Sequence, residues 1–590
     1  MARGSRTFSG TVYGIDLGTT YSCLARVAAD GAPEVVPLLD GTMTLPSVVL
    51  FVGPDDYVTG ESARALSRAQ PEDVCTLVKR RMGDGEWRFV SHDRSWSAPA
   101  VSSLVLKALV IETGFNTASP VRDVVITVPA YFGDEERRAT KLAGEYADLT
   151  VLDVINEPTA AALSYGFARL DGAGPVSLSA DGQPAGDDTE VALVYDLGGG
   201  TVDVTIVELA QRRLAVVAID GDHELGGADW DEKLAVHLSR AFVAAHPDAE
   251  DPLDDSAGGQ ALILAAESAK RELTERESVV VPVEHDGRRH DVTVTRAEFE
   301  RLTAGLLHRT VELTHAAVAG ARERGVQRID RVLLVGGSSR MPAVAARLGG
   351  ELGVPAELHD PDLAVAKGAA IYGRKKSMER LLAADLVTRG QLVDGSPIEL
   401  ADPGDLQAAC QRLGDAYGLS AAEVRRTVEV QVLNVCSRGF GILALDRYGE
   451  GGVVFLVHRN DRLPISVRRS FGTVYDDQPV VTVRVVEQGG GAESSRPEDG
   501  KLIAEASIVD IPPGHPAGSE IEITLRMGFD GILELTALHE GVADRPLTVR
   551  IETSAALSQA DVARERAQVG KVHRRVPLGK DRPQGDGPEL

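Results

Sequence analysis

Two short segments of the sequence combine an aspartate with small residues, a pattern suited to binding phosphate. The first runs from Asp16 to Thr20 (DLGTT), and the second runs from Asp196 to Thr201 (DLGGGT). Glycine lacks a Cβ atom, so its backbone N–H can come close to phosphate oxygens. The aspartate carboxylates suit Mg²⁺, which prefers oxygen ligands. One such loop is weak evidence because Asp-Gly turns are common, but the matched pair predicts a nucleoside triphosphate site.

Each loop lies between an apolar strand and an alternating strand. TVYGIDLG at 11–18 leads into the first loop, and VALVYDLG at 191–198 leads into the second. The repetition indicates an internal duplication, with two similar lobes facing each other across a cleft. A third strand-to-helix junction, VLLVGGSSRMPAV at 332–344, carries Pro342 early in the expected helix, where proline is tolerated.

The composition is that of a globular protein with several domains. The chain has 590 residues, of which 43% are hydrophobic and 25% are charged, and this length predicts about three or four domains. A net charge of -26 argues against binding to nucleic acid or to anionic membranes. No apolar segment is typical of a signal peptide or a membrane span, and the cysteines are widely separated, so we expect reduced thiols and a cytoplasmic location.

The residue pattern changes along the rest of the chain. Residues 171–190 are rich in Gly, Pro, Asp and Ser, which predicts a mobile surface insertion. Polar residues with helical spacing come before a series of short alternating strands, which predicts an all-β domain. The expected division is a first large unit at 8–380, a mostly helical connecting insertion at 381–429, a linker at 430–435, the all-β domain at 436–553, and a short helix with a disordered tail at 554–590.

Seven motifs occur in the order that is typical of one ATPase family. They are DLGTTYSCLA, VPAYFGDEERRATKLAG, INEPTAAALSYG, DLGGGTVDVTI, GDHELGGADWD, VLLVGGSSRMPAV and DPDLAVAKGAA, all within residues 11–375. On these motifs the chain resembles the seventy-kilodalton heat-shock chaperones (DnaK-like). The resemblance implies an α/β actin-like ATPase domain of two lobes, in the fold shared by heat-shock proteins and hexokinase, with ATP or ADP and Mg²⁺ as ligands. More weakly, RNDRLP, VYDDQPVV, IVDIPPG and DGILELTAL imply a β-sandwich domain that binds peptides.

The resemblance assigns the catalytic roles. Lys79 would position the attacking water and steady charge on the γ-phosphoryl group, because hydrolysis depends on positioning and electrostatics. Glu157 would sense the metal and water cluster and relay the nucleotide state toward Pro129 and Arg137. The alternatives are a solvated basic turn for Lys79 and a favourable charge at a helix N-terminus for Glu157. The other residues of the catalytic set are Asp16, Asp196 and Thr201.

The ligand contacts are assigned in the same way. Asp16, Asp196 and Asp203 would hold Mg²⁺, mostly through water. The helix that carries Glu267 and Lys270 would line the adenosine pocket, the alternative being an ion pair on a surface helix. The full set of nucleotide contacts is Gly18, Thr19, Thr20, Tyr21, Gly198, Gly199, Gly200, Gly226, Gly227, Glu267, Lys270, Thr274, Gly336, Gly337, Ser338, Arg340 and Asp362.

A hydrophobic peptide groove in the β domain carries over only loosely from the resemblance. Leu445 and Val474 would form an arch over the backbone of an extended peptide, which is a common mode of capture for a sheet protein. The alternative for each residue is a place in the domain core. The groove set is Ile442, Leu445, Phe471, Val474, Val481 and Val483.

Three departures from the family pattern affect regulation. The linker carries a polar Gln431 and a neutral Asn434 in place of leucine and aspartate, so we expect weaker docking onto the ATPase unit. Asp153 stands where the family has a basic residue that receives J-domain cochaperones, which makes a standard J-domain partner doubtful. No helical lid pattern follows the β domain, so we expect weak and rapidly exchanging peptide binding.

Two functions remain open from the sequence. The first is an ATP-dependent chaperone that couples nucleotide hydrolysis to binding of unfolded or apolar polypeptide segments, with a nucleotide-exchange factor as a further partner. The alternative is a regulatory or scaffold ATPase whose β domain binds one dedicated protein. An actin-like filament protein or small-molecule kinase is less favoured, because neither explains the β domain. We expect no nucleic-acid or membrane partner in any of these cases.

Overall fold

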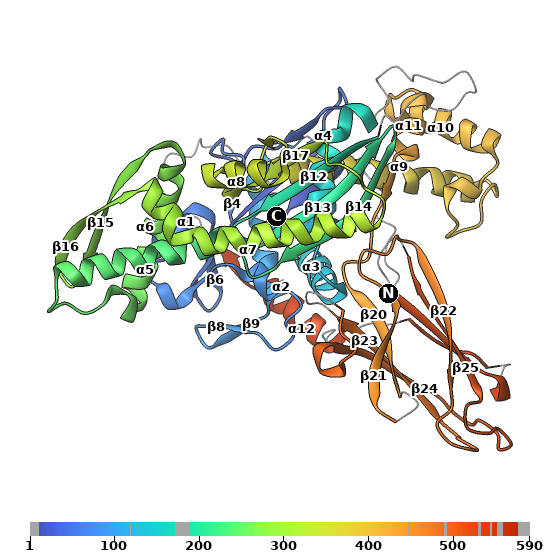
Figure 1. Cartoon of the computed structure of the whole chain (residues 1–590). Helices are drawn as coiled ribbons and strands as arrows, with labels where there is room; N and C mark the ends of the chain where they lie inside the picture. Colours follow the sequence, from blue (N-terminus) through green and yellow to red (C-terminus); the bar gives the residue numbers. More distant parts are fainter. Residues whose placement is uncertain are drawn as a thin grey trace.

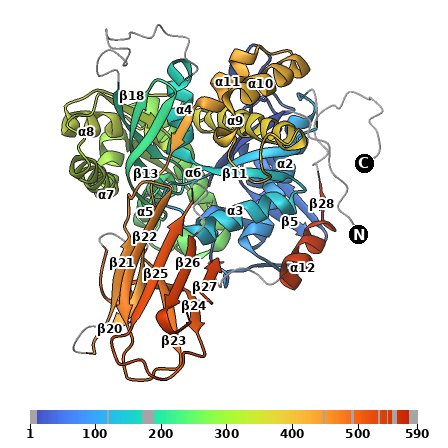
Figure 2. The same ribbon diagram turned by 90° about the vertical axis from the view of Figure 1, so that its right-hand side faces the viewer.

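The protein consists of a two-lobed α/β body that carries a helical segment and a separate β domain (Figure 1). In Figure 2 the β domain lies on the opposite side of the body from helices α10 and α11. The computed structural model describes residues 11–117, 120–170, 189–445, 449–488, 493–528, 533–542, 545–550 and 559–575. The insertion predicted at 171–190 therefore falls almost entirely outside the described residues.

Lobe I (residues 11–156) is built on a sheet with the order β11-β10-β1-β2-β3, with β4 paired to β2. Strands β10 and β11 run parallel to β1, whereas β2 and β3 continue from it as an antiparallel meander. Its strands are β1 (Val12–Asp16), β2 (Tyr21–Val27), β3 (Pro33–Val35), β4 (Leu45–Pro46), β10 (Asp123–Val128) and β11 (Thr150–Asn156).

Lobe II (residues 190–358) repeats this arrangement with the order β18-β17-β12-β13-β14. Strand β12 takes the place of β1, because it pairs parallel with β17 and antiparallel with β13. The internal duplication predicted from the two loops is confirmed by this matching strand order. The strands are β12 (Glu190–Leu197), β13 (Val202–Ala210), β14 (Arg213–Asp222), β17 (Arg331–Val335) and β18 (Ala356–Leu358).

Two helices pack between the sheets of the lobes, α4 (Glu157–Leu170) and α9 (Ala364–Thr388). They approach so closely that a Cβ atom on Gly368 would lie 1.7 Å from the carbonyl oxygen of Ala160. Small residues are needed at this crossing because backbone meets backbone. Their apolar side chains join the two sheets into one core.

The remaining elements decorate the outer faces of the lobes. In lobe I they are β5 (Val49–Gly53), β6 (Asp56–Thr59), α1 (Gly60–Leu66), η1 (Pro71–Asp73), β7 (Val74–Cys75), η2 (Val78–Arg81), β8 (Phe89–Ser91), β9 (Arg94–Trp96), α2 (Ala98–Gly114) and α3 (Asp134–Tyr146). In lobe II they are α5 (Gly227–Ala245), η3 (Pro252–Asp254), α6 (Ser256–Glu275), β15 (Ser278–His285), β16 (Arg288–Thr295), α7 (Arg296–Glu323), η4 (Gly337–Arg340) and α8 (Pro342–Leu352).

The helical segment, which ends with α11 at Glu429, begins as a direct continuation of helix α9. Helix α9 continues past the predicted boundary at 380 as far as Thr388, so that boundary lies inside a continuous helix. Short η5 (Ile398–Leu400) leads to α10 (Pro403–Tyr417) and α11 (Ala421–Glu429), which share a small apolar core with the end of α9. Asp402 and Ser420 cap the N-termini of these two helices through their side chains, as their residue types favour.

The β domain consists of two four-stranded antiparallel sheets around one apolar core. Val481, Val483 and Val485 point into this core while Thr482 and Arg484 face solvent, which is the period of two expected for a half-buried strand. The strands are β20 (Gly439–Leu445), β21 (Gly451–Val457), β22 (Ile465–Gly472), β23 (Val481–Gln488), β24 (Lys501–Ile508), β25 (Glu520–Met527), β26 (Leu533–His539) and β27 (Leu547–Arg550), with η6 (Pro497–Asp499) and η7 (Glu540–Val542) between them.

The segment after the β domain returns to lobe I. A short helix is predicted there and is present as α12 (Gln559–Val569). The sequence did not predict strand β28 (His573–Arg574), which pairs with β6 of lobe I. The predicted tail disorder concerns residues 576–590, which lie outside the described ranges. Among the helices of the described residues, none is long and apolar enough to cross a bilayer.

Candidate active site

A cavity of about 650 Å³ lies between the two lobes, where the ends of β1 and β12 meet. Both predicted loops, helix α6 and the η4 turn contribute to its wall. Of the residues predicted from the sequence, the cavity is lined by Asp16, Gly18, Thr19, Thr20, Tyr21, Lys79, Glu157, Asp196, Gly198, Gly199, Thr201, Glu267, Lys270, Thr274, Gly336, Gly337, Ser338, Arg340 and Asp362. Gly200, Asp203, Gly226 and Gly227 stand behind this wall.

The two loops touch each other across the cleft, and glycine makes the contact possible. A Cβ atom on Gly199 would lie 2.3 Å from Cγ2 of Thr20, and one on Gly200 would lie 2.3 Å from Cγ2 of Thr19. Atoms cannot approach so closely, so either the threonine side chain or the loop would have to move. The second loop is therefore glycine-rich because it packs on the first, in addition to any need for ligand access.

Acidic side chains converge beneath the loops. Strand register places Asp196 directly opposite Asp203, and Asp16 ends the equivalent strand of lobe I. Burial and the nearby Glu157 raise the pKa of Asp16 to about 7 and that of Asp203 to about 8. The pKa of Asp196 is raised by the same two causes. Such a cluster is costly to charge unless cations are close by.

Lys79 supplies one of those cations. It lies in the η2 turn, is only 4% exposed, and forms an ion pair with Glu157 at the start of α4. Burial alone would lower its pKa, but Glu157 and Asp16 outweigh that effect and raise the pKa of Lys79. The solvated-turn alternative for Lys79 is therefore wrong, whereas the neighbouring Arg81 is exposed as such a turn requires.

The donor set around the three aspartates fits a hydrated divalent cation. The Oδ2 atom of Asp203 is buried and has no hydrogen-bond partner among the described residues. Across all the described residues, no three His, Cys, Asp or Glu side chains are close enough to hold a metal ion together. Hard oxygen ligands that reach a cation through its water shell are the arrangement that Mg²⁺ favours. Asp16, Asp196 and Asp203 are thus the residues that would hold the ion.

The other end of the cavity is closed by charged contacts, several of which the sequence did not predict. Glu267 accepts from the guanidinium of Arg64 at 2.5 Å, and this pair joins lobe II to lobe I. Lys270 pairs with Asp231 at 2.8 Å, while Arg271 stands 5.8 Å from the ring centre of Tyr21. Arg271 could have been predicted, because it lies four residues after Glu267 and therefore on the same face of the helix. Arg64 had no signal in the sequence.

A further bridge between the lobes comes from the residue after Lys79. The Nε atom of Arg80 donates to the carbonyl oxygen of Gly200 at 2.8 Å, and the same guanidinium pairs with Asp229 at 2.6 Å. Arg80 therefore fixes the η2 turn of lobe I to the second loop of lobe II.

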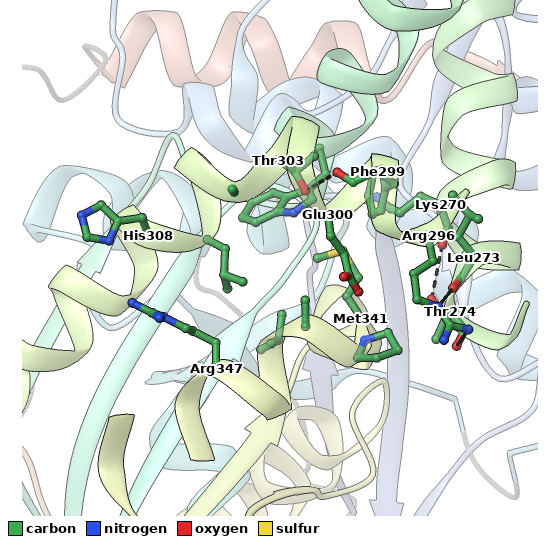
Figure 3. Close-up of a pocket in the computed structure, with 16 residues that line it drawn as sticks. Lys270, Leu273, Thr274, Arg296, Phe299, Glu300, Thr303, His308, Met341 and Arg347 are labelled. Carbon is green, nitrogen blue, oxygen red and sulfur yellow. Dashed lines mark hydrogen bonds between the residues drawn. The ribbon is translucent and has the colours of Figure 1, made fainter. Parts of the chain in front are cut away.

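Helix α6 separates the cleft from a second cavity of about 320 Å³ (Figure 3). The two cavities share Lys270, Thr274 and Met341 as lining residues. Arg296 lies beside this wall and donates to the carbonyl oxygen of Leu273 at 2.7 Å, which holds the C-terminal turn of α6. Lys270 and Thr274 therefore line both cavities, one on each side of α6.

A continuous set of contacts links the acidic cluster with the β domain. The backbone N–H of Tyr131 donates to Asp203 at 3.2 Å, and the ring of Tyr131 lies between Arg438 and Arg459 of the β domain, 5.7 and 5.5 Å from their guanidinium carbons. Arg459 also pairs with Asp220 of lobe II at 2.8 Å. Tyr131 thus touches both the site and the second domain.

Arg438 is the centre of a second contact between the domains. It pairs with Glu136 of lobe I at 2.8 Å and with Glu487 of its own domain at 3.4 Å. Arg137 forms a hydrogen bond with Asn156, next to Glu157, and donates to the carbonyl oxygen of Phe132 at 3.1 Å. The predicted relay residue Arg137 therefore lies between the site and this interface.

The predicted groove residues do not form one surface. Ile442, Val481 and Val483 are buried in the domain core, and Phe471 packs against that core. Leu445 and Val474, the two predicted arch residues, are 54% and 61% exposed.

Two of the departures have clear structural outcomes. Gln431–Leu433 forms strand β19, which pairs parallel with β14 at the edge of lobe II. The segment is therefore docked despite its polar residues, and the strength of that docking stays a prediction. Asp153 accepts from the hydroxyl of Tyr372 at 2.9 Å and lies 3.2 Å from Nζ of Lys376. Its carboxylate is thus held against α9.

The comparison with protein families agrees with this geometry. A sequence model of the Hsp70 protein family matches residues 12–386 and 420–577. The unmatched stretch between these ranges contains η5 and α10 of the helical segment. Both the two-lobed body and the β domain fall within the match, and the chain therefore belongs to the Hsp70 family.

Proposed function

We propose that the protein is an ATP-dependent chaperone, which hydrolyses ATP to ADP and couples the nucleotide state to binding of apolar polypeptide segments. The observation that carries the proposal is the one cleft that both loops, Asp16, Asp196 and the Lys79–Glu157 pair line, with Asp203 opposite Asp196 on the next strand. Membership of the Hsp70 family supports a chaperone role for this arrangement.

In this proposal the chain supplies positioning and electrostatics. Backbone N–H groups of the two glycine loops and the hydroxyls of Thr19, Thr20 and Thr201 bind the phosphate oxygens. The Lys79 ammonium, oriented by Glu157, steadies charge on the γ-phosphoryl group and holds the attacking water. A bound Mg²⁺ would neutralise charge on the β- and γ-phosphates. Because phosphoryl transfer needs little covalent help from the protein, one well-placed cation can account for most of the rate effect.

The coupling between the domains follows the contacts of Tyr131. A change at Asp203 would shift the backbone of Tyr131, which lies against the two arginines of the β domain. The linker strand β19 adds a second connection on lobe II. Two separate connections between the ATPase body and the β domain make nucleotide-dependent docking physically reasonable.

Clients in this proposal are extended apolar segments that reach the exposed Leu445 and Val474. A nucleotide-exchange factor remains a proposed partner, and a standard J-domain partner remains doubtful because Asp153 is acidic and held by α9. The buried, reduced cysteines suit a cytoplasmic location.

Steady-state ATPase activity with and without a panel of unrelated apolar peptides tests the proposal. Stimulation by many of the peptides supports a chaperone. Hydrolysis that is indifferent to every peptide would instead favour the scaffold ATPase, and absence of hydrolysis with Mg²⁺ present would exclude both.

A further inference from the structure

The C-terminal arm, residues 559–575, packs on lobe I although it follows the β domain in the sequence (Figure 2). Helix α12 lies against α2 and α3, and strand β28 extends the sheet to the order β28-β6-β5-β7. The arm therefore contributes to the ATPase body from the far end of the chain.

The helix of the arm docks through one defined face. Val562, Glu565 and Val569 are spaced by three and four residues, so they lie on the same side of α12. Val569 is buried in the core of lobe I, and Glu565 beside it accepts from the hydroxyls of Ser97 at 2.7 Å and Tyr146 at 3.1 Å. A buried carboxylate is costly unless it is hydrogen-bonded. Glu565 thus fixes the position of α12 on lobe I, because only there can its carboxylate accept from both hydroxyls.

The strand of the arm adds main-chain and ionic contacts. The N–H groups of His573 and Arg575 each donate over 2.8 Å to lobe I carbonyl oxygens, those of Asp55 and Tyr57. Arg574 forms an ion pair with Glu112 at 2.7 Å, and both side chains are largely buried. These contacts close the edge of β6, which would otherwise expose unpaired backbone groups.

Helix α2 lies between the arm and the η2 turn that carries Lys79, because both α12 and η2 pack against it. Strand β7, which leads into η2 after two residues, forms the far edge of the sheet that β28 extends, with β6 and β5 between the two. In addition, Val562 lines a cavity of about 230 Å³ together with Gly83, Asp84 and Gly85, which follow η2 and Met82 in the sequence. The arm therefore lies next to the segment that follows the turn, and it reaches the turn itself through α2.

Side chains of the turn share a core with the arm. Val78, the first residue of the turn, and Met82, which directly follows it, belong to the same apolar cluster as Val569. Ser97, the partner of Glu565, caps the N-terminus of α2, and Ser102 on that helix donates to the sulfur of Met82 at 3.6 Å. Displacement of the arm would leave the packing incomplete around α2, the helix on which the η2 turn rests.

We infer that the C-terminal arm is a positioning element of the ATPase site, which holds the Lys79 turn in its working geometry. This role rests on the proposed ATP hydrolysis. It means that hydrolysis also depends on residues that do not contact the nucleotide. Because the arm does not line the cleft, its loss reduces the hydrolysis rate and leaves nucleotide affinity nearly unchanged.

The direct test compares the full chain with a chain that ends at residue 558. Single-turnover ATP hydrolysis should fall by at least about tenfold in the shortened chain, while the affinity for a fluorescent ADP analogue should change by no more than about twofold. A synthetic peptide of residues 559–577, added in trans, should restore hydrolysis. Unchanged hydrolysis in the shortened chain would overturn the inference.

Point variants keep the test valid if the shortened chain folds poorly. Glu565→Lys should reproduce the loss because a buried ammonium cannot accept the two hydroxyl bonds, whereas Glu565→Gln retains an acceptor and should be close to wild type. Arg564→Ala is the matched control, since its side chain on the same helix is 74% exposed. Equal activity of the Lys, Gln and control variants would contradict the inference.

Hydrogen exchange separates this inference from the proposed function. If the wild-type chain does not hydrolyse ATP, the proposed function fails, yet the arm can still be judged without nucleotide. The amides of Arg80 and Met82, bonded within the turn, should exchange faster in the shortened chain, and equal exchange would reject the positioning role.

Discussion

The nucleotide cleft and the predicted peptide groove were both assigned by family resemblance, but their assigned residues are arranged differently in the structure. Residues assigned to the cleft gather around one cavity, whereas those assigned to the groove divide between the domain core and solvent. The cleft residues are glycines, threonines and carboxylates at strand ends, and such residues have few reasons to converge other than a ligand. Apolar residues on a strand serve a core equally well. The difference shows that residue type limits how specific a carried-over assignment can be.

The largest effect should come from the cleft. Lys79→Ala removes the buried cation beside Glu157, so ATP hydrolysis should fall by about 100-fold or more, as measured in single-turnover assays. Nucleotide binding should survive because the loops and α6 are unchanged. Arg81→Ala is the control, since Arg81 is exposed and should leave the rate near wild type. Hydrolysis that survives in Lys79→Ala would refute the catalytic assignment.

The buried groove residues should behave as core. Val483 is 2% exposed, so Val483→Ala should reduce the free energy of unfolding by about 2 kcal/mol, measured by denaturant titration. A Val483→Ala protein of wild-type stability but reduced peptide affinity would place this residue in a groove after all.

The exposed pair should behave in the opposite way. The double variant Leu445→Ala, Val474→Ala should weaken the binding of an apolar peptide by about tenfold, measured by fluorescence anisotropy. Its unfolding free energy should change little, because both side chains are already exposed to solvent. Peptide affinity equal to that of wild type would remove these residues from the client site.

A smaller, pH-dependent effect is expected where the two regions meet. Burial raises the pKa of Glu487 from 4.5 to about 7 against the opposing pull of Arg438, and nearby Glu136, Glu135 and Asp134 add to the rise. Since the pKa is raised in the docked state, docking is most stable below the ordinary pKa and weakens as the pH rises through 7. The linkage limit is about tenfold per pH unit, and we expect a change of a few fold overall. Energy transfer between dyes on lobe I and the β domain, followed from pH 5 to pH 8, measures it.

Glu487→Gln provides the control for that measurement. The amide keeps a similar shape but does not titrate in this range, so its docking should be independent of pH. A pH profile that is the same in wild type and in Glu487→Gln would show that another group controls docking.

Much of the architecture could be predicted because it follows from local patterns of residue type and spacing. The repeated Asp-Leu-Gly loops predicted two lobes, and the change from helical to alternating spacing predicted the β domain. The fate of the C-terminal segment could not be predicted. Strand β28 has only two residues, and its pairing with β6 depends on a partner more than 500 positions earlier. Local composition contains no signal for such a contact.

The site shows the same limit in finer detail. Lys79 could be assigned from its motif, but its burial depends on Glu157, which lies on another element. Arg64 reaches Glu267 across the cleft from a helix that carries no motif. Leu445 is exposed and Ile442 is buried because of how the two sheets pack on each other. The pattern of a single strand does not specify that packing.

The central claim is that one cleft controls the β domain, and peptide release tests it most directly. A fluorescent apolar peptide bound to the nucleotide-free protein is chased with excess unlabelled peptide, with and without Mg-ATP. Our account predicts a different release rate when ATP is present, in wild type and in the non-hydrolysing Lys79→Ala variant alike. Identical release rates with and without ATP, in a protein shown to bind ATP, would contradict it.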